Sequence, residues 1–328
     1  MFRKNNTKIA FVYHADYKTG IDTNYSITFG FLEKYFPSHY IVIKHSLYNG
    51  GETRIYRNGI NGNYKTAPII GKIPVPFRYL FETIFSFFYL LLGDYRTVIT
   101  LNPLSALAPC ILRILKKKCK VYFISPDFSK KRFENPIMNK FYFLVDKFST
   151  KYCSKNICNS VHVINYKKEL YSKLNLEGKF FHMPNIPNPW VIETFVRIKK
   201  ERNRIIYVGG VGTQLDFEKI IDVINKLKQV SPDVNLAIIG DGNRKSYLEE
   251  YVNRNKIDNV KFLGVLSHQD TLKEIAKSEF GIALYNGSLN FDEFRDSCKI
   301  REYQALSCIP ITTDVVRSNY EEIRDNDS

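Results

Sequence analysis

The stretch RIIYVGGVG, residues 204–212, decides the fold of this chain. Its β-branched and aromatic residues favour a buried strand, and helical spacing begins a few residues later, at Leu215. Two adjacent glycines between a strand and a helix let the backbone approach a phosphate at the helix N-terminus. The spacing departs from the dinucleotide fingerprint GxGxxG, because Leu215 stands at the third glycine position. A plain tight turn is therefore the alternative.

The same alternation of strand and helix continues to the end of the chain. Strands are predicted at Arg204–Val208, Asn235–Ile239, Val260–Leu263, Phe280–Leu284 and Ile309–Thr313, with helices at Leu215–Val230, Arg244–Asn255, Gln269–Lys277 and Ser297–Leu306. Strands that recur every 25–30 residues or so, with helices between them, predict βαβ units and a parallel sheet.

The first half alternates in the same way. Strands are predicted at Lys8–Tyr13, Tyr40–Lys44, Thr97–Leu101, Lys120–Ile124 and Val161–Ile164, helices at Tyr25–Phe36, Phe77–Leu92, Leu104–Leu115 and Ile137–Cys153, and an exposed loop at Asn49–Asn63. Prolines and a basic run mark residues 184–203 as a linker region. The predicted fold class is α/β, with two Rossmann-like domains, parallel sheets and a cleft between them: residues 1–190, a linker at 191–203, and residues 204–328.

Charge is divided unevenly between the two halves. Residues 1–202 contain 32 Lys and Arg against 13 Asp and Glu, a net charge of +19, whereas residues 203–328 contain 16 against 20, a net charge of −4. Such an asymmetry indicates that the first half meets an anionic partner, either nucleic acid or an anionic membrane surface. A general basic bias of the proteome would have spread the charge over both halves.

Composition excludes several classes of protein. With 44% hydrophobic and 25% charged residues, the chain is neither disordered nor collagen-like nor a coiled coil. Its six cysteines form no CxxC pair, which disfavours structural zinc and a disulfide framework and favours a reducing cytosol. The first residues show no signal peptide. Residues 81–92 are too few to span a membrane, so they form either a buried core helix or a partly exposed interfacial one.

The segment from Asp296 to Ala305 breaks a local charge rule. Lys299 falls in the first turn of the predicted helix, where a cation opposes the helix dipole, and Glu302 follows three residues later. A lysine beside free helix N–H groups suits a diphosphate, and Glu302 could accept both hydroxyl groups of a ribose. A solvated ion pair on a surface helix is the alternative. Asp241, in the turn before Arg244, is either a second ligand-binding residue or a helix cap.

Taken in order, these segments resemble the nucleotide-sugar domain of GT-B glycosyltransferases, closest to family 4 and its relatives. The residues that carry the resemblance are Tyr207-Val208-Gly209-Gly210, Ile239-Gly240-Asp241-Gly242, Val260-Lys261-Phe262-Leu263-Gly264, and Ser297, Lys299, Glu302-Tyr303, Ala305, Ile309-Pro310 and Thr313-Asp314. They span residues 204–328, whereas the first half matches only in outline.

The resemblance implies a role for each matching position. Glu302 would hold the donor ribose, Lys299 the donor phosphates, residues 209–212 the diphosphate, and residues 263–266 the base. The expected donor-binding residues are Gly209, Gly210, Thr213, Asp241, Leu263, Gly264, Ser297, Lys299 and Glu302.

Three features depart from the family pattern. Phe294 replaces the glutamate expected eight residues before Glu302, and Thr213 and Gln214 stand where Arg and Lys are common. Since the family usually continues past the equivalent of Ser328, the C-terminal part is expected to be incomplete.

Candidate acceptor residues lie in the first half. Asp127 follows a predicted strand at the cleft and is the expected general base, with an Asp in a simple turn as the alternative. Asp16 and Asp22, in the loop after the first strand, are expected to bind the acceptor, beside the further candidates His14 and Asn24.

The resemblance thus implies a metal-independent hexosyltransferase that uses a nucleotide diphosphate sugar as donor and needs no cofactor. A lipid-linked or saccharide acceptor, an anionic membrane surface and a peripheral location on the cytoplasmic face of the cell membrane are expected, with a role in cell-surface polysaccharide assembly. A GT-B epimerase or hydrolase of nucleotide sugars, and a basic nucleic-acid-binding protein, are the alternatives. The chain contains no recognisable nucleic-acid-binding motif, which disfavours the second alternative.

Overall fold

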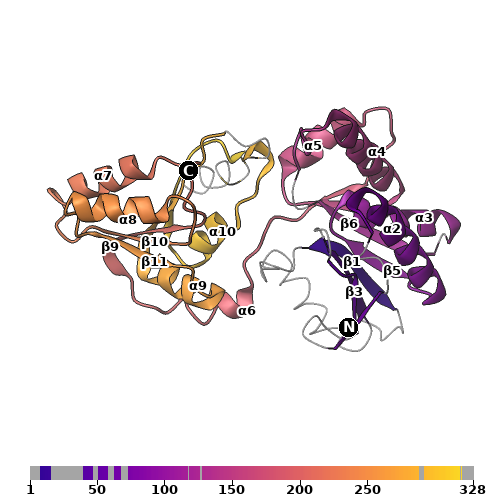
Figure 1. The fold of residues 1–328 in the computed structure, drawn as a ribbon, viewed down its shortest axis with the longest axis horizontal. Helices are drawn as coiled ribbons and strands as arrows, with labels where there is room; N and C mark the ends of the chain where they lie inside the picture. Colours follow the sequence, from indigo (N-terminus) through magenta and orange to yellow (C-terminus); the bar gives the residue numbers. More distant parts are fainter. Residues whose placement is uncertain are drawn as a thin grey trace. The chain divides into compact units, whose positions relative to one another are not determined.

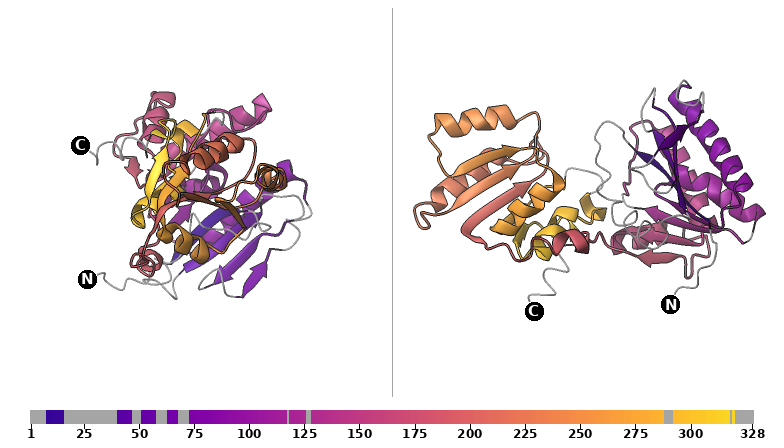
Figure 2. Two further views of the ribbon diagram at one scale, coloured as in Figure 1. Left: turned by 90° about the vertical axis from the view of Figure 1, so that its left-hand side faces the viewer. Right: turned by 90° about the horizontal axis from the view of Figure 1, so that it is seen from below.

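The computed structural model describes residues 8–15, 40–46, 51–57, 63–67, 73–116, 118–125, 128–287, 292–317 and 319. The chain divides into two compact units, Met1–Pro184 and Asn185–Ser328 (Figures 1 and 2). This division differs from the predicted one, because residues 185–203 fall within the second unit. The predicted linker contains the end of helix α6 (Pro189–Ile192) and the start of strand β9 (Glu201–Val208).

The first unit is built on a mixed sheet of eight strands. In sequence they are β1 (Ile9–Ala15), β2 (Tyr40–Ser46), β3 (Arg54–Arg57), β4 (Tyr64–Thr66), β5 (Thr97–Thr100), β6 (Lys120–Ser125), β7 (Lys155–Cys158) and β8 (Phe180–His182). The order across the sheet is β4-β3-β2-β1-β5-β6-β7-β8. Strands β2, β1 and β5 to β8 are parallel, whereas β3 and β4 pair antiparallel.

Helices α2 (Val75–Leu92), α3 (Pro103–Leu115) and α4 (Pro136–Tyr152) form one layer of this unit, with α3 packed between the other two (Figure 1). Asparagine side chains cap two of these helices: Asn102 Oδ1 accepts from Ser105 N in α3, and Asn135 Oδ1 accepts from Ile137 N in α4. Both helices then begin with a proline, whose missing N–H costs nothing at that position.

Two predictions for the first unit are wrong. Residues 161–164 form the first turn of helix α5 (Val161–Leu170), because Ser160 caps the helix by accepting a hydrogen bond from His162 N. The strand lies just before them, at β7. The expected loop at 49–63 contains strand β3, whose side chains Ile55 and Tyr56 are buried. The helix predicted at 25–36 lies outside the described residues.

The second unit has an all-parallel sheet in the order β11-β10-β9-β12-β13. Its strands are β9, β10 (Asn235–Ile239), β11 (Val260–Gly264), β12 (Ser278–Ala283) and β13 (Ile309–Thr312), and its further helices are α7 (Phe217–Leu227), α8 (Lys245–Arg254), α9 (His268–Lys277), α10 (Cys298–Ala305) and the 3-10 turn Asp292–Phe294. Each predicted strand and helix of this unit is present. The two units are Rossmann-like, as predicted.

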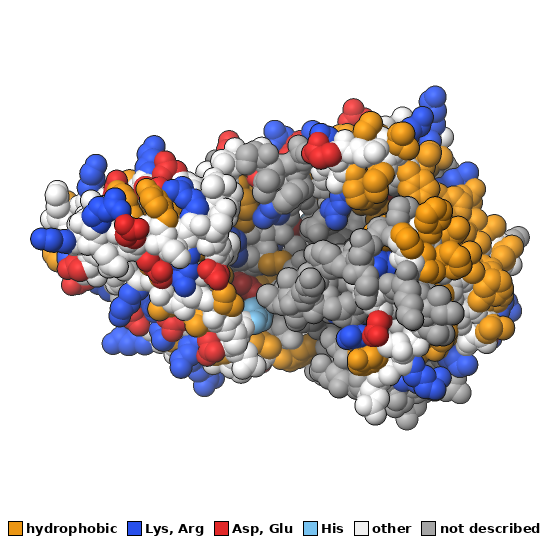
Figure 3. Space-filling view, in the orientation of Figure 1, with side chains coloured by type: hydrophobic (Ala, Val, Ile, Leu, Met, Phe, Trp, Pro, Cys, Tyr) orange, Lys and Arg blue, Asp and Glu red, His pale blue; other side chains and the backbone are white. Residues whose placement is uncertain are grey.

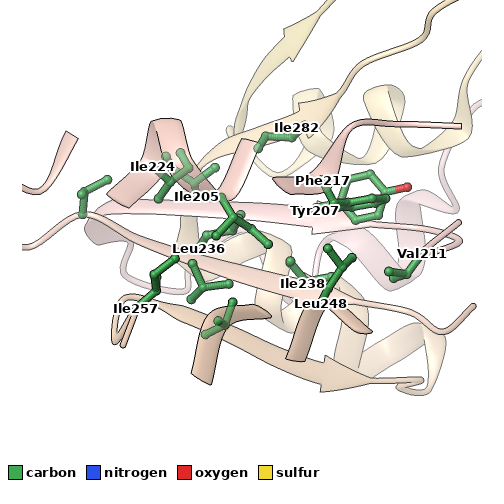
Figure 4. Close-up of a cluster of buried hydrophobic side chains, with 14 residues drawn as sticks. Ile205, Tyr207, Val211, Phe217, Ile224, Leu236, Ile238, Leu248, Ile257 and Ile282 are labelled. Atoms are coloured by element: carbon green, nitrogen blue, oxygen red, sulfur yellow. The ribbon is translucent and has the colours of Figure 1, made fainter. Parts of the chain in front are cut away.

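Apolar clusters cover both faces of this sheet. Ile205, Tyr207, Leu236 and Ile238 pack with α7 and α8 on one face (Figure 4), whereas Ile206, Ala237 and Ile239 pack with α9 and α10 on the other. Successive strand residues point to opposite faces, so burial on both sides requires the near-continuous apolar runs seen in the sequence.

Glycines allow the ends of three strands to meet. A Cβ on Gly240, whose φ is +133°, would lie 1.9 Å from the carbonyl oxygen of Gly209, and one on Gly242 would lie 2.2 Å from that of Val211. The backbone hydrogen bonds Gly209 N to Ile239 O and Gly240 N to Gly264 O fasten the same turns. The turns after β9 and β10 therefore pack backbone against backbone.

We expect Gly240→Ala to destabilise the second unit. The backbone conformation alone costs about 1–3 kcal/mol for a residue with a Cβ, and the overlap with Gly209 adds to it. Guanidinium unfolding followed by the fluorescence of Trp190, the single tryptophan and a residue of this unit, measures the effect. Gly210→Ala is the matched control, since its Cβ would be in ordinary contact at 3.6 Å. Equal midpoints for both variants would contradict the packing argument.

Candidate active site

The order of the strands in the second unit fixes where a ligand can bind. From the central strand β9 the chain continues to β10 on one side and later returns as β12 on the other. The loops after β9 and β12 therefore separate at the carboxyl edge of the sheet, where open α/β sheets bind their ligands. Gly209 and Gly210 follow β9, and Tyr285 follows β12.

The ammonium group of Lys299 lies at this edge. Its Nζ is 4.9 Å from the ring centroid of Tyr207 and 5.8 Å from that of Tyr285. A Cβ at Gly209 would lie only 2.9 Å from the same nitrogen, so a larger residue there would crowd the ammonium. Removal from water and the nearby guanidinium of Arg295 lower the pKa of Lys299 from 10.5 to about 8. An anion bound here would restore the charge.

The N-terminus of α10 adds to the positive potential around Lys299. Ser297 stands at the N-cap position, but its side chain does not cap the helix and instead hydrogen-bonds to the Tyr285 hydroxyl at 2.7 Å. The N–H group of Ser297 itself donates to Asn319 Oδ1. The positive end of the helix dipole thus points into the same region as the ammonium group.

The glycine loop after β9 is held from two sides. The Tyr207 hydroxyl and the Gln214 amide both donate to the carbonyl oxygen of Gly210, at 2.9 and 2.7 Å. Burial raises the pKa of Tyr207 to about 12, so its hydroxyl remains a donor at neutral pH. Asn286, which follows β12, donates to the Gln214 carbonyl. A hydrogen bond therefore links the loop after β9 to the loop after β12.

Glu302 lies one turn further along α10 and faces helix α9. His268 Nε2 is 2.8 Å from Glu302 Oε1, and this hydrogen bond raises the pKa of His268 above 6.5. Ser267 caps α9 by accepting from Asp270 N, which places His268 at the first position of the helix. The structure pairs Glu302 with His268, so the alternative of a Lys299–Glu302 ion pair is wrong.

The other predicted donor residues lie nearby but differ in environment. Asp241 is exposed, and its Oδ1 accepts from Gly242 N rather than capping α8, which begins after Arg244 with no side-chain cap. Gly264, with φ +69°, ends β11 next to the half-buried Leu263 and accepts from Gly240 N. Thr213 is exposed in the glycine loop.

Not every predicted residue can be placed. The expected base Asp127 and the expected acceptor residues Asp16 and Asp22 lie outside the described residues. His14 is buried at the end of β1, bonded to Ser105 and Glu82.

Sequence reasoning did not single out the roles of Tyr207, Tyr285 and His268. Tyr285 directly follows the predicted strand 280–284, so its position at a strand's carboxyl end was the available signal. His268 could not be found in this way, because it contacts a residue 34 positions away.

The two Rossmann-like units give the chain the GT-B fold, and similarity to solved structures extends over nearly its whole length. It superposes on Anabaena HepE in complex with UDP with a TM-score of 0.61 and 11% identity, covering 98% of this chain and 91% of that one. A putative UDP-N-acetylglucosamine 2-epimerase from Listeria monocytogenes gives 0.60 and 9%, covering 96% and 82%. The lipopolysaccharide outer core galactosyltransferase WaaB in its apo form gives 0.59 and 16%, covering 94% and 81%.

Residues 190–328 match the family model described as glycosyl transferases group 1. The match covers the second unit almost completely and includes every residue of the site described above. The chain therefore resembles GT-B glycosyltransferases both in its fold and in the sequence family of its second unit. No curated protein matches the chain in sequence.

We expect the pKa of His268 to fall toward 6.5 in the variant Glu302→Gln. The folded-state pKa is raised, so the pair stabilises the protein below pH 6.5 and loses this contribution as the pH rises through the folded value. NMR titration of the imidazole signals measures the change, with His268→Gln assigning the resonance. Glu250→Gln, on the exposed Arg254 pair, is the control. An unchanged His268 pKa in Glu302→Gln would contradict the pairing.

Proposed function

We propose that this protein is a glycosyltransferase that moves a sugar from a nucleotide diphosphate sugar to a membrane-borne acceptor. The observation that carries the proposal is the ammonium of Lys299, held over two tyrosine rings beside Gly209 and the N-terminus of α10. Its family match and the UDP named in the structure of Anabaena HepE support a nucleotide donor.

In this proposal the site stabilises the leaving diphosphate. Negative charge develops on the diphosphate as the bond to the sugar breaks, and Lys299 with the helix N–H groups is preorganised to meet it. Because Lys299 is poorly hydrated, an anion gains more from it than from an exposed lysine. We propose that this cation takes the place of a divalent metal. Glu302 would accept the ribose hydroxyls, and the loop at Leu263 and Gly264 would hold the base.

The acceptor is proposed to be lipid-linked and to be modified at the cytoplasmic face of the cell membrane, during assembly of a cell-surface polysaccharide. The net charge of +19 over residues 1–202 supports an anionic surface as partner. Asp16 and Asp22 are proposed to bind the acceptor, and Asp127 to deprotonate its hydroxyl group.

A nucleotide-sugar epimerase is the second candidate, since a putative one shares the fold. The two reactions differ in their products. A transferase releases a nucleoside diphosphate and needs an acceptor, whereas an epimerase interconverts two sugars. We expect NMR screening of nucleotide sugars to find one bound donor, and that donor to be consumed only when lipid extract from the source cell is present. Conversion of the sugar without lipid would overturn the transferase proposal.

We expect Lys299→Ala to weaken UDP binding far more than uridine binding, because the ammonium meets only phosphate oxygens. A charge-assisted hydrogen bond is worth about 1.5–3 kcal/mol, or roughly 10–150-fold in Kd. In the wild type, UDP binding near pH 8 should take up protons, since part of Lys299 is then neutral and the diphosphate recharges it. Calorimetry in two buffers of different ionisation enthalpy measures this uptake.

Glu302→Ala is the matched control, because it should weaken uridine and UDP binding alike. Equal losses of UDP and uridine in Lys299→Ala would mean that the lysine has a structural role instead.

A further inference from the structure

Helix α2 has the reverse of the polarity usual in a water-soluble protein. On its inner face Arg78, Glu82 and Ser86 are buried, each 2% exposed or less, together with Leu90. The large side chains exposed on α2 are all apolar: Phe77, Leu80, Phe81, Ile84, Phe88 and Leu92, between 44% and 83% exposed. Surface helices normally turn the apolar stripe inward and the charges outward. Of the two alternatives for residues 81–92, the exposed helix is the one observed.

The buried polar side holds α2 in this orientation. Glu82 lies 3.1 Å from His14 of β1 and 3.4 Å from Arg78. Ser86 is hydrogen-bonded to His45 of β2, and Arg78 donates to the Ser46 carbonyl. Burial lowers the pKa of His45 well below 6.5, so it is neutral in this cluster. Rotating α2 to bury its phenylalanines would separate these charges and leave them without partners in the interior.

The apolar surface continues across the same layer of helices. On α4 the exposed apolar side chains are Ile137, Met138, Phe141 and Leu144, and at the end of α3 they are Ile114 and Leu115. Figure 3 shows hydrophobic side chains gathered over these helices. We call the exposed apolar side chains of α2, α3 and α4 the apolar face. Ordinary soluble monomers rarely expose so many neighbouring apolar groups.

Basic residues outnumber acidic ones around the apolar face. The only acidic residues of the three helices, Glu82 and Asp146, are both 2% exposed, and Asp146 is paired with Lys167 at 2.8 Å. The exposed charged residues of the helices and of the turn after α3 are Lys116, Lys118, Lys140 and Lys151. The exposed acids beside these helices, Asp94 and Glu134, are paired with Lys116 and Lys131. An apolar surface with a basic rim is complementary to an anionic lipid headgroup layer above acyl chains.

We propose that the apolar face docks into an anionic lipid bilayer, with the side chains of α2 and α4 inserted at the headgroup boundary. This inference rests on the proposed function, whose acceptor is membrane-borne, and names the surface that brings the enzyme to it. Within the described residues, no helix is long and apolar enough to cross a membrane. The lysines around the apolar face argue against a second copy of the chain as its binding partner, since a symmetric dimer would bring two basic surfaces together.

Vesicle flotation tests the inference. The full chain is mixed with phosphatidylcholine vesicles that contain one part in three of phosphatidylglycerol, and the bound fraction gives the partition coefficient. We expect the double variant Phe81→Ser, Phe88→Ser to bind at least tenfold more weakly, because two half-exposed rings lose their burial in lipid. Phe181→Ser, which removes an equally exposed ring from edge strand β8, should bind like the wild type.

The basic rim is tested by Lys118→Gln and Lys140→Gln. Each is expected to weaken binding about fivefold at low salt and to have little effect in vesicles of phosphatidylcholine alone. Equal flotation of the Phe81/Phe88 double variant and the Phe181 variant would overturn the inference. So would a wild-type dimer that becomes monomeric in the Phe81/Phe88 variant without any vesicle binding.

Two measurements separate this inference from the proposed function. Glu302→Ala should float like the wild type although it binds UDP poorly, and the Phe81/Phe88 variant should bind UDP normally although it floats poorly. Normal flotation of a protein that binds no nucleotide would leave the docking surface standing and refute the glycosyltransferase. Normal UDP binding by a wild-type protein that does not float with vesicles would refute the docking surface and leave the glycosyltransferase standing.

Discussion

The site of the second unit depends on one steric constraint, the contact between the backbones of Gly209 and Gly240. The turn after β9 and the turn after β10 share space that any Cβ would occupy, so the two strand ends meet with no side chain between them. Lys299 reaches the open carboxyl edge because Gly209 also leaves room for its ammonium group. A Cβ on Gly240 would disturb this packing, and one on Gly209 would crowd the ammonium group.

The electrostatics of the site follow from what surrounds this lysine. Tyrosine faces attract the ammonium group but do not neutralise it, and the partial loss of water makes its charge costly in the absence of an anion. Glu302, the nearest carboxylate on the same helix, is paired with His268 instead. Helix α10 thus carries a cation and a carboxylate with different partners, and we propose that they bind the phosphate and the ribose of the donor.

In the first unit, helix α2 has a buried polar face and an exposed apolar face. Glu82 and its partners hold the inner face of α2 against the sheet, so aromatic side chains of the opposite face are exposed. We propose that this outer face meets an anionic lipid surface, and the lysines around it support that proposal.

The sequence by itself determined the elements of the second unit, because each strand is an apolar run ended by a turn and each helix has its own period. It also singled out Gly209 in the turn after a strand, and Lys299 with Glu302 in a helix segment that breaks a local charge rule. It misread residues 161–164, since a short apolar run suits a strand or a capped helix equally well. Only the tertiary structure decided which face of α2 is buried, because that depends on His14 and His45 from distant strands. The pairing of β12 with β9 likewise brought Tyr285 to Lys299, and the packing of α9 brought His268 to Glu302. Such contacts join residues far apart in the chain, and no local period encodes them.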